Sequence, residues 1–274
     1  MIWLNGRILA PAEARIDPRD RGFTLGDGLF ETLAAENGRP LHLAAHLERL
    51  QRATKVLELP LPVEMSEFPG AIAELLAAND LVGSAAALRI TLSRGVGSRG
   101  LLMPLDAKPT LVITAAHHPP VPDHLDASIV AIRRNEGSPL SRLKSLNYLD
   151  NVLAQQEAGA RGADEGLMLN NGGRVAGFAR GNVFLLKGRR LLTPPLADGV
   201  LDGIVRHLLL AKGGGIGLEI REHSLGRADL DAADGLFITN SLLGCVPIRR
   251  LDGRDLPIAA DIGKQLISLT KDPD

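Results

Sequence analysis

The proline-rich segment His117–Leu125 limits most strongly what this chain can fold into. Its sequence, HHPPVPDHL, contains three prolines, and proline lacks the N–H group that a β-ladder needs. The flanking segments PTLVITAA and ASIVAIRR are rich in β-branched and aliphatic residues, which is typical of strands. The sequence therefore predicts an N-terminal α/β domain at 1–117, a linker at 118–125 and a strand-rich C-terminal domain at 126–274.

Both predicted domains mix strands with helices. Asn5-Gly6 in IWLNGRIL supplies the positive backbone angles of a tight turn and predicts a hairpin over residues 2–9. Apolar residues recur at helical spacing in LHLAAHLERLQRATKVLEL, and a second helix is expected at about Ser66–Ala78. ALRITLSRG completes the predicted strands of this domain.

The C-terminal domain carries Gly-containing turns in LMLNNGGRV and VFLLKGRRLLTP, which predict two hairpins. GIVRHLLLA predicts a helix. The run Gly213–Gly215 follows this helix instead of leading from a strand into one, which favours a helix C-cap and turn over a phosphate-binding loop. The expected fold class is α/β (α+β).

Charge and cysteine content exclude several functional classes. The formal net charge of the 274 residues is -1, and no block of one sign could follow a phosphate backbone or an anionic membrane. We expect no nucleic acid or membrane partner. The single cysteine, Cys245, excludes an internal disulfide and fits a reducing compartment. The N-terminus lacks a signal-peptide pattern, so a cytoplasmic protein is expected.

Lys144 is unusual in a chain that uses arginine for most of its positive charge. It stands between Leu143 and Leu146 in SRLKSLNYLDNVLA, a segment that resembles the start of a helix. Burying an amine is costly. The pattern therefore indicates either a lysine whose head reaches water or a reactive nitrogen.

Four separated parts of the sequence together indicate a functional site: RGFTLGDGLFET (21–32), HLERL (46–50), the Lys144 segment, and GVLDGIVR (199–206) with TNSLLGCVPI (239–248). Together with the order of elements, they resemble the class IV aminotransferase family over nearly the whole chain. Members of this family bind pyridoxal 5'-phosphate on the two-domain fold type IV scaffold, as in D-amino acid aminotransferase. They include branched-chain aminotransferases and 4-amino-4-deoxychorismate lyase.

The resemblance implies a role for each matching residue. Lys144 takes the position of the Schiff-base lysine, whose amine is displaced by the substrate amine and then moves a proton. Tyr148 is expected near the phenolic oxygen of the cofactor, although a packing role would also explain it. The residues expected at the phosphate are Arg49, Gly203, Ile204, Val205, Ser241 and Leu242.

General chemistry explains why residues of these types would bind a phosphate in the positions that the resemblance implies. A phosphate monoester needs a cation and several backbone donors, and the helix that opens at Gly203 would direct its first amides at the negative charge. Ser241 would contribute its hydroxyl and Leu242 its main-chain amide. Many relatives have Thr where this chain has Val205, so one hydroxyl contact is missing. Without the family context, Arg49 would be read as a solvated residue on an amphipathic helix.

Gly177 is the main departure from the family pattern. VAGFARGNVF has glycine where relatives have the glutamate that keeps the pyridine nitrogen protonated. Arg180 could turn toward the ring instead, but strand alternation places residues 177 and 180 on opposite faces. Water or a carboxylate from elsewhere could also serve. The third account is a cofactor-binding scaffold with weak chemistry. This third account predicts that Gly177→Glu raises turnover.

The resemblance narrowly favours the lyase over a transaminase of D- or branched-chain amino acids. RITLSRGVGSRG contains Arg94 and Arg99 in a pattern common in the lyase, and both are expected to bind substrate. TNSLLGCVPI also looks more like the turn of the lyase. The side chains expected to line the substrate site, with core packing as the alternative, are Phe23, Leu25, Leu29 and Phe30. The charge of Glu31 is expected to be structural.

The resemblance also implies the partners. The substrate is a small molecule that carries an amine, and fold type IV sites are usually completed by a loop from a second subunit, so a homodimer is expected. The seven histidines show no spacing typical of metal ligation, and no metal is predicted. A non-enzymatic scaffold stays an alternative, for which Gly177 is the best argument.

Overall fold

The computed structural model describes residues 1–97, 99–257 and 260–271, and the chain forms two compact units. The first contains Met1–Pro120 together with Lys144–Asn147, and the second contains Val121–Leu143 and the chain from Tyr148 onward. The change of unit after Pro120 lies inside the predicted linker. Lys144, which follows that linker in sequence, is nevertheless grouped with the first unit, because its segment pairs with a strand there.

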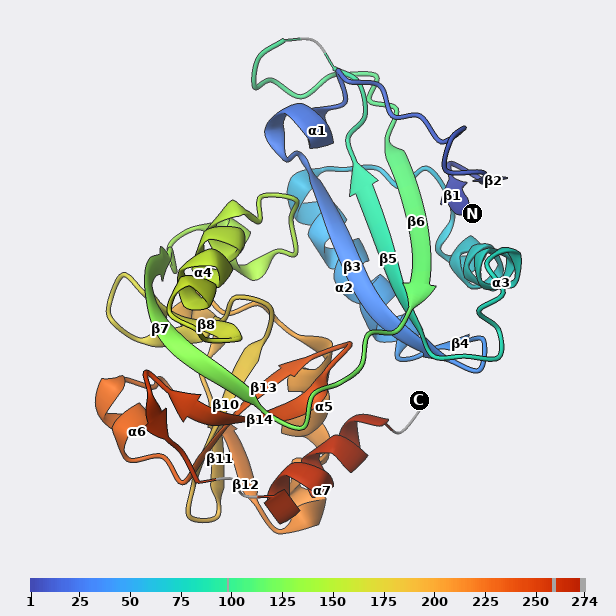
Figure 1. Cartoon of the computed structure of the whole chain (residues 1–274). Coiled ribbons are helices and arrows are strands. Elements are labelled where there is room, and N and C mark those ends of the chain that lie inside the picture. The colour runs from blue at the N-terminus through green and yellow to red at the C-terminus, as the bar shows by residue number, and fades with distance from the viewer. Residues whose placement is uncertain (98, 258–259, 272–274) are drawn as a thin grey trace. The chain divides into compact units, whose positions relative to one another are not determined.

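In the described part of the first unit, six strands form an antiparallel sheet in the order β2-β1-β6-β5-β3-β4 (Figure 1). Its strands are β1 (Ile2–Leu4), β2 (Arg7–Leu9), β3 (Gly28–Glu36), β4 (Arg39–Pro40), β5 (Ala86–Ser93) and β6 (Thr110–His117). The predicted hairpin at 2–9 is confirmed. Asn5 and Gly6 have φ values of 46° and 86°, which a two-residue hairpin turn of this kind requires.

The helices of this unit are α1 (Arg21–Leu25), α2 (Leu43–Leu57) and α3 (Phe68–Ala78), preceded by a 3-10 turn at Met65–Glu67. Helix α2 packs on β3, and α3 packs on β1 and β6 (Figure 1). The apolar spacing explains the orientation of α2, because Leu47 and Leu50 are buried while Glu48 and Gln51 are exposed. Both long helices were predicted. The short α1, capped by the Asp20 side chain, was not.

In the described part of the second unit, the main path of the sheet runs β12-β11-β10-β13-β14-β7-β8-β9, and β15 pairs with β14. The pairs β11–β12, β14–β7 and β7–β8 are parallel and the others antiparallel. The strands are β7 (Leu125–Arg134), β8 (Glu165–Asn170), β9 (Val175–Phe178), β10 (Asn182–Lys187), β11 (Arg190–Thr193), β12 (Glu219–Glu222), β13 (Gly235–Asn240), β14 (Gly244–Leu251) and β15 (Arg254–Asp255). The two predicted hairpins correspond to β8–β9 and β10–β11.

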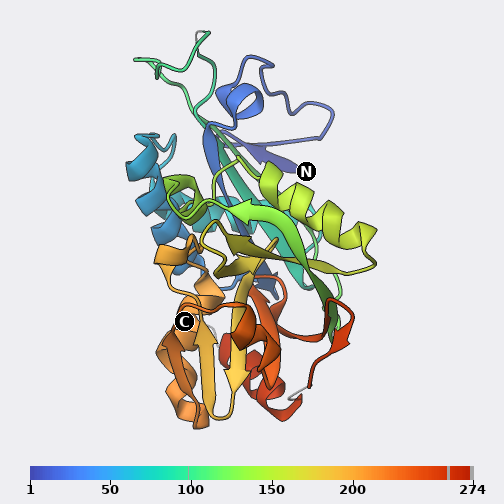
Figure 2. The same cartoon turned by 90° about the vertical axis from the view of Figure 1, so that its left-hand side faces the viewer.

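The helices of the second unit are α4 (Leu149–Ala160), α5 (Ile204–Lys212), α6 (Arg227–Asp231) and α7 (Ala260–Lys271), with 3-10 turns at Pro139–Arg142, Leu196–Asp198 and Gly213–Ile216. Helix α4 lies along β7 and β8 in both views (Figures 1 and 2). The glycine run forms a 3-10 turn directly after α5, so it does not join a strand to a helix.

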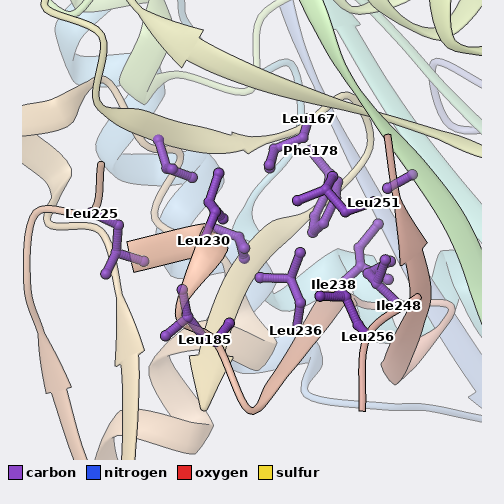
Figure 3. Packing of buried hydrophobic residues seen from close by; sticks show 14 of the residues in the cluster. Leu167, Phe178, Leu185, Leu225, Leu230, Leu236, Ile238, Ile248, Leu251 and Leu256 are labelled. Atoms are coloured by element: carbon purple, nitrogen blue, oxygen red, sulfur yellow. The ribbon is translucent and has the colours of Figure 1, made fainter. Parts of the chain in front are cut away.

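The main core of the second unit lies on one face of its sheet. Leu167, Phe178, Ile238 and Ile248 from four strands meet there with Leu230 of α6 (Figure 3). All five side chains are at most 2% exposed. Burial of this size supplies most of the favourable free energy of folding. No helix in the described ranges is long and apolar enough to cross a membrane.

Candidate active site

Lys144 lies on an extended segment that pairs with the beginning of β3. The N–H of Phe30 donates to the Lys144 carbonyl at 2.8 Å, and the N–H of Leu146 donates to the Gly28 carbonyl at 2.9 Å. A Cβ at residue 28 would lie 2.4 Å from the Leu92 carbonyl oxygen of the neighbouring β5 and 2.7 Å from Cδ1 of Leu146, so this position requires glycine. The expected helix start at Lys144 is therefore wrong. Helix α4 begins five residues later, at Leu149.

The Lys144 amine lies over an aromatic ring among other cations. Its Nζ is 4.2 Å from the centre of the Phe30 ring, and Cζ of Arg89 is 3.9 Å from the same centre. Burial lowers the pKa of Lys144 to about 7; the positive charges of Arg49 and Arg89 act in the same direction, and Glu31 opposes them. A large fraction of this amine is thus unprotonated at neutral pH, as a nucleophile requires.

Arg49 is held in place by a buried carboxylate on β3. Arg49 donates from Nε to Oε1 of Glu31 at 2.8 Å and from Nη2 to Oε2 at 2.6 Å. His46 donates from Nδ1 to Glu31 Oε2 at 2.7 Å. Burial would raise the pKa of Glu31, but Arg49 and His46 lower it to about 2. The fixed charge of Glu31 thus orients Arg49, in agreement with the structural role expected for Glu31.

Burial also controls the protonation of His46. It lowers the pKa of this histidine, although Glu31 acts in the opposite direction. His46 is 1% exposed, so the neutral tautomer with its proton on Nδ1 is the form that donates to Glu31. The group around Lys144 therefore combines one ionised carboxylate, two arginines and an amine of lowered pKa.

Arg94 has a structural partner at each of its donor nitrogens. It donates from Nε to Asp27 at 2.8 Å, and from Nη1 and Nη2 to the carbonyls of Glu58 and Leu57 at 2.9 and 2.7 Å. These carbonyls lie at the C-terminal end of α2. The contacts account for the burial of Arg94 without a substrate. Its predicted substrate contact, and that of Arg99 in the exposed loop after β5, stay predictions.

The four apolar residues expected to line the substrate site lie in different surroundings. Phe23 and Leu25 on α1 are 79% and 41% exposed, whereas Leu29 is 1% exposed and belongs to the core. The ring of Phe30 lies beside the Lys144 amine. Arg89 shares this ring but was missed in the sequence. The feature that could have identified Arg89 is a charged residue at an outward-facing position of the strand ALRITL, in which buried and more exposed positions alternate.

In the second unit, the predicted phosphate-binding residues gather at one edge of the sheet. Asn182, at the start of β10, pairs with Thr239 near the end of β13. The Asn182 side chain donates to the Leu201 carbonyl at 2.8 Å, and a Cβ at residue 203 would lie 1.9 Å from its Oδ1. Gly203 is therefore needed where the chain enters α5. The first amides of this helix, from Ile204 and Val205 onward, have no partner within it.

The turn after β13 supplies further polar groups at this edge. The N–H groups of Leu242 and Leu243 donate to Asn240 Oδ1 at 3.0 and 2.8 Å, an arrangement typical of an Asx turn. The predicted main-chain donor at Leu242 is thus bound to Asn240 here. Ser241 is partly buried. Thr239 Oγ1 is buried with no hydrogen-bond partner among the described residues, so this edge has a polar group in need of a ligand.

Gly177 adopts a backbone conformation that side chains rarely accept. Its φ is 145°, and a Cβ there would lie 3.1 Å from the Gly181 carbonyl oxygen. Arg180 does not fill this position, because it donates from Nε to Glu165 at 2.5 Å. Glu165 is fully buried, and burial raises its pKa although Arg180 opposes the shift. Tyr148, partly buried at the start of α4, lies near enough to Arg134 for an electrostatic interaction.

No group of three or more His, Cys, Asp or Glu residues in the described ranges is arranged to hold a metal ion. The first unit offers a nucleophilic amine and fixed guanidinium groups, and the second offers a helix N-terminus. An amine of this kind suits a carbonyl, and a helix N-terminus suits a phosphate.

Comparison with known proteins agrees with this set of groups. Residues 28–251 match the family described as amino-transferase class IV. The chain is 35% identical over 257 residues to aminodeoxychorismate lyase of Bacillus subtilis (strain 168), covering 92% of this chain and 87% of that protein. It is also 35% identical over 256 residues to a Methanocaldococcus jannaschii protein described as a branched-chain-amino-acid aminotransferase, covering 92% and 88%.

Two solved structures extend the comparison to the fold. The 4-amino-4-deoxychorismate lyase of Pseudomonas aeruginosa superposes with a TM-score of 0.86 at 32% identity, covering 98% of this chain and 97% of that one. A structure described as a hypothetical aminotransferase from Mycobacterium tuberculosis in its PLP-bound form gives a TM-score of 0.85 at 25% identity, covering 98% of this chain and 97% of that one. The family match and the shared fold together identify the chain as a member of the class IV aminotransferase family, the fold type IV enzymes that use pyridoxal phosphate.

Proposed function

We propose that this enzyme is a 4-amino-4-deoxychorismate lyase that releases pyruvate and leaves 4-aminobenzoate. Gly177 carries the choice within the family. A transaminase must return a proton to the cofactor carbon and needs strong stabilisation of the charge left when the substrate proton is removed. In the lyase, the negative charge left on the substrate is carried away directly by the departing leaving group, and the ring becomes aromatic. A site without the usual carboxylate at residue 177 therefore suits the lyase reaction better than transamination.

The residues present fit pyridoxal phosphate. A buried amine of lowered pKa matches the aldehyde, and the N-terminus of α5 together with the unsatisfied Thr239 hydroxyl matches the phosphate. We assign the covalent attachment to Lys144. We assign the phosphate to Arg49, to the amides that follow Gly203 and to Ser241. When bound, the cofactor withdraws electrons from the carbon that bears the amine and makes its proton acidic.

The protein side chains then supply binding and proton transfer. Lys144 Nζ removes the proton from the ring carbon that bears the substrate amine. The bond between the neighbouring ring carbon and the ether oxygen breaks, and pyruvate leaves in its enol form. Arg89, whose guanidinium shares the Phe30 ring with Lys144, binds a substrate carboxylate, because a guanidinium matches carboxylate geometry. Arg49 is kept in position by Glu31.

We also propose that the enzyme is a homodimer. Leu101, Leu102 and Phe23 are between 79% and 88% exposed, and Arg21 holds the nearby loop by donating to the Gly100 carbonyl at 3.0 Å. Ordered apolar side chains of this kind are typical of a protein contact. A second copy of the chain is the partner proposed. Sedimentation should give the mass of a dimer, and Leu101→Asp with Leu102→Asp should shift it toward the monomer.

The function is tested by two product assays on the same purified protein. The cofactor-loaded enzyme and Lys144→Ala are each given 4-amino-4-deoxychorismate, and 4-aminobenzoate and pyruvate are measured. In parallel, D-alanine or L-leucine is supplied with 2-oxoglutarate, and glutamate is measured. Equal amounts of 4-aminobenzoate and pyruvate from wild type alone support the lyase. Glutamate without 4-aminobenzoate would overturn it.

A transaminase is the second candidate, because the chain is as similar in sequence to a branched-chain-amino-acid aminotransferase as to the lyase. Arg89 suits this candidate equally well, since every amino acid substrate carries a carboxylate. A third outcome separates the scaffold alternative from both enzymes. In that case the protein would bind the cofactor through Lys144, but none of the substrates would change its absorbance.

A further inference from the structure

Arg134 lies at the end of β7. Among the described residues, no carboxylate lies within ion-pair distance of its guanidinium group. It donates from Nη1 to Asn151 Oδ1 at 3.3 Å and from Nη2 to Met168 Sδ at 3.6 Å. The first contact is weak because it is long, and the second is weak because a thioether sulfur is a poor acceptor. Burial lowers the pKa of Arg134, and electrostatic interactions with Tyr148 and Asp150 act against this shift. A cation in such surroundings is costly without an acceptor.

The strand register links this guanidinium to Gly177 through Met168. Arg134 pairs with Asn170 on β8, so the Arg134 side chain lies on the same face as Asn170 and Met168. Met168 is in turn the cross-strand partner of Gly177 on β9. The sulfur atom that Arg134 contacts therefore belongs to the residue directly opposite the glycine. Gly177 occupies the strand position at which relatives carry their glutamate.

The other charged pair of this region lies on the opposite face. Glu165 and Leu167 alternate with Met168 along β8, and Leu167 belongs to the main core. The carboxylate of Glu165 binds the backbone and side chain of Arg180. Neither Glu165 nor Arg180 is therefore placed to replace the missing glutamate on the face of Met168.

Neighbouring backbone holds the aliphatic part of Arg134 in place. A Cβ on Gly199 would lie 3.0 Å from Arg134 Cγ, and Gly199 precedes the segment that enters α5. On the helix side, Asn151 accepts from Arg134 and donates to the Ala179 carbonyl at 2.6 Å. The guanidinium is thus bordered by β8, the start of α4 and the segment before α5. This last segment leads to the predicted phosphate site.

We propose that Arg134 replaces the family glutamate by donating a hydrogen bond to the ring nitrogen of pyridoxal phosphate and thereby keeps this nitrogen unprotonated. The inference rests on the proposed function only in requiring that the cofactor bind. A guanidinium is a donor without an acceptor site, so it can bind the neutral nitrogen but not the protonated one. An unprotonated ring withdraws electrons less strongly, which favours loss of the leaving group over transamination.

Nitrogen NMR of the bound cofactor tests this directly, without a catalytic assay. The protein is loaded with pyridoxal phosphate labelled with 15N in its ring, and the resonance is followed across neutral pH. Wild type should keep the resonance of a neutral pyridine. In Arg134→Met the resonance should move upfield toward the protonated position as the pH falls. Cofactor affinity should drop about tenfold, the effect of one lost hydrogen bond from a charged donor.

Matched variants separate the explanations. Arg133→Met removes an exposed arginine from the neighbouring position of β7 and should leave the resonance unchanged. Arg134→Lys keeps the charge and serves if the methionine variant does not fold; it should alter the resonance without protonating the ring. Asp198→Asn tests a carboxylate alternative, because Asp198 Oδ2 is buried and lacks a partner among the described residues.

A protonated ring nitrogen in wild type would overturn the proposal, and so would identical resonances in wild type and Arg134→Met. If Asp198→Asn converted a protonated ring into a neutral one, Asp198 would be the replacement instead. Failure to load cofactor on Lys144 at all would be a different result. It would refute the proposed function, whereas a loaded but protonated cofactor would refute only the role of Arg134.

Discussion

The N–H of Phe30 donates to the carbonyl of Lys144 at 2.8 Å, and the amine of the same lysine lies 4.2 Å from the centre of the Phe30 ring. One residue of β3 thus positions both the backbone and the reactive end of Lys144. A lysine side chain has four rotatable carbons and loses considerable entropy when it is ordered. Fixing its backbone to β3 reduces the range of positions that the amine can reach.

The amine of Lys144 should react at neutral pH. Its pKa of about 7 predicts that acylation or reductive methylation of the cofactor-free protein at this site rises with pH around a midpoint near that value, because only the unprotonated amine is a nucleophile. Arg89→Met should move the midpoint upward, since Arg89 lowers this pKa. Mass spectrometry of the modified peptide gives the rate. A midpoint close to that of an ordinary lysine would contradict the prediction.

Glu31 should make the fold sensitive to acid. Its pKa is about 2 in the folded protein against an ordinary value of 4.5, so the folded state binds fewer protons than the unfolded state between these values. The stabilisation is present above pH 4.5 and is lost as pH falls toward 2, by roughly 3 kcal/mol in all. Urea unfolding at several pH values measures this loss. Glu31→Gln should be less stable at neutral pH and show a smaller loss.

Arg94 should contribute to stability more than to substrate binding. Arg94→Met removes the contacts to Asp27 and to the C-terminal carbonyls of α2, which should lower the free energy of unfolding by about 3 kcal/mol. Asp27 retains Arg21, so the loss should not be larger. Arg99→Met, on the exposed loop, is the control and should leave stability unchanged. A stable Arg94→Met protein with a raised KM would instead support the predicted substrate contact.

Gly177 should resist substitution. At a φ of 145° a side chain is strained, and Gly177→Ala should lower the free energy of unfolding by about 1–3 kcal/mol. Gly70→Ala is a suitable control, because Gly70 lies in α3 with open space around its Cβ position and alanine favours a helix. The scaffold account predicts that Gly177→Glu raises turnover, and this must be tested at a temperature where the variant is folded, with thermal unfolding measured alongside.

Local patterns were sufficient to predict much of the fold. The Asn5-Gly6 hairpin, α2 and the strands β5, β6 and β7 follow from turn chemistry and from residue patterns that act over a few neighbours along the chain. The same patterns failed at Lys144, because SLNYLDNVLA resembles a helix from its first residue. Pairing with β3, more than a hundred residues earlier in the sequence, holds this segment extended until Leu149.

The family motifs named the residues of the site, but tertiary structure decided what each one contacts. Arg94 and Arg99 look alike in the sequence, yet Arg94 is buried against Asp27 and Arg99 is exposed. Arg89 and Arg134 have no motif of their own, and their positions beside Phe30 and Met168 arise from strand pairing. Sequence patterns report which face a residue prefers, whereas charge and hydrogen bonding depend on groups that only the folded chain brings within a few ångströms.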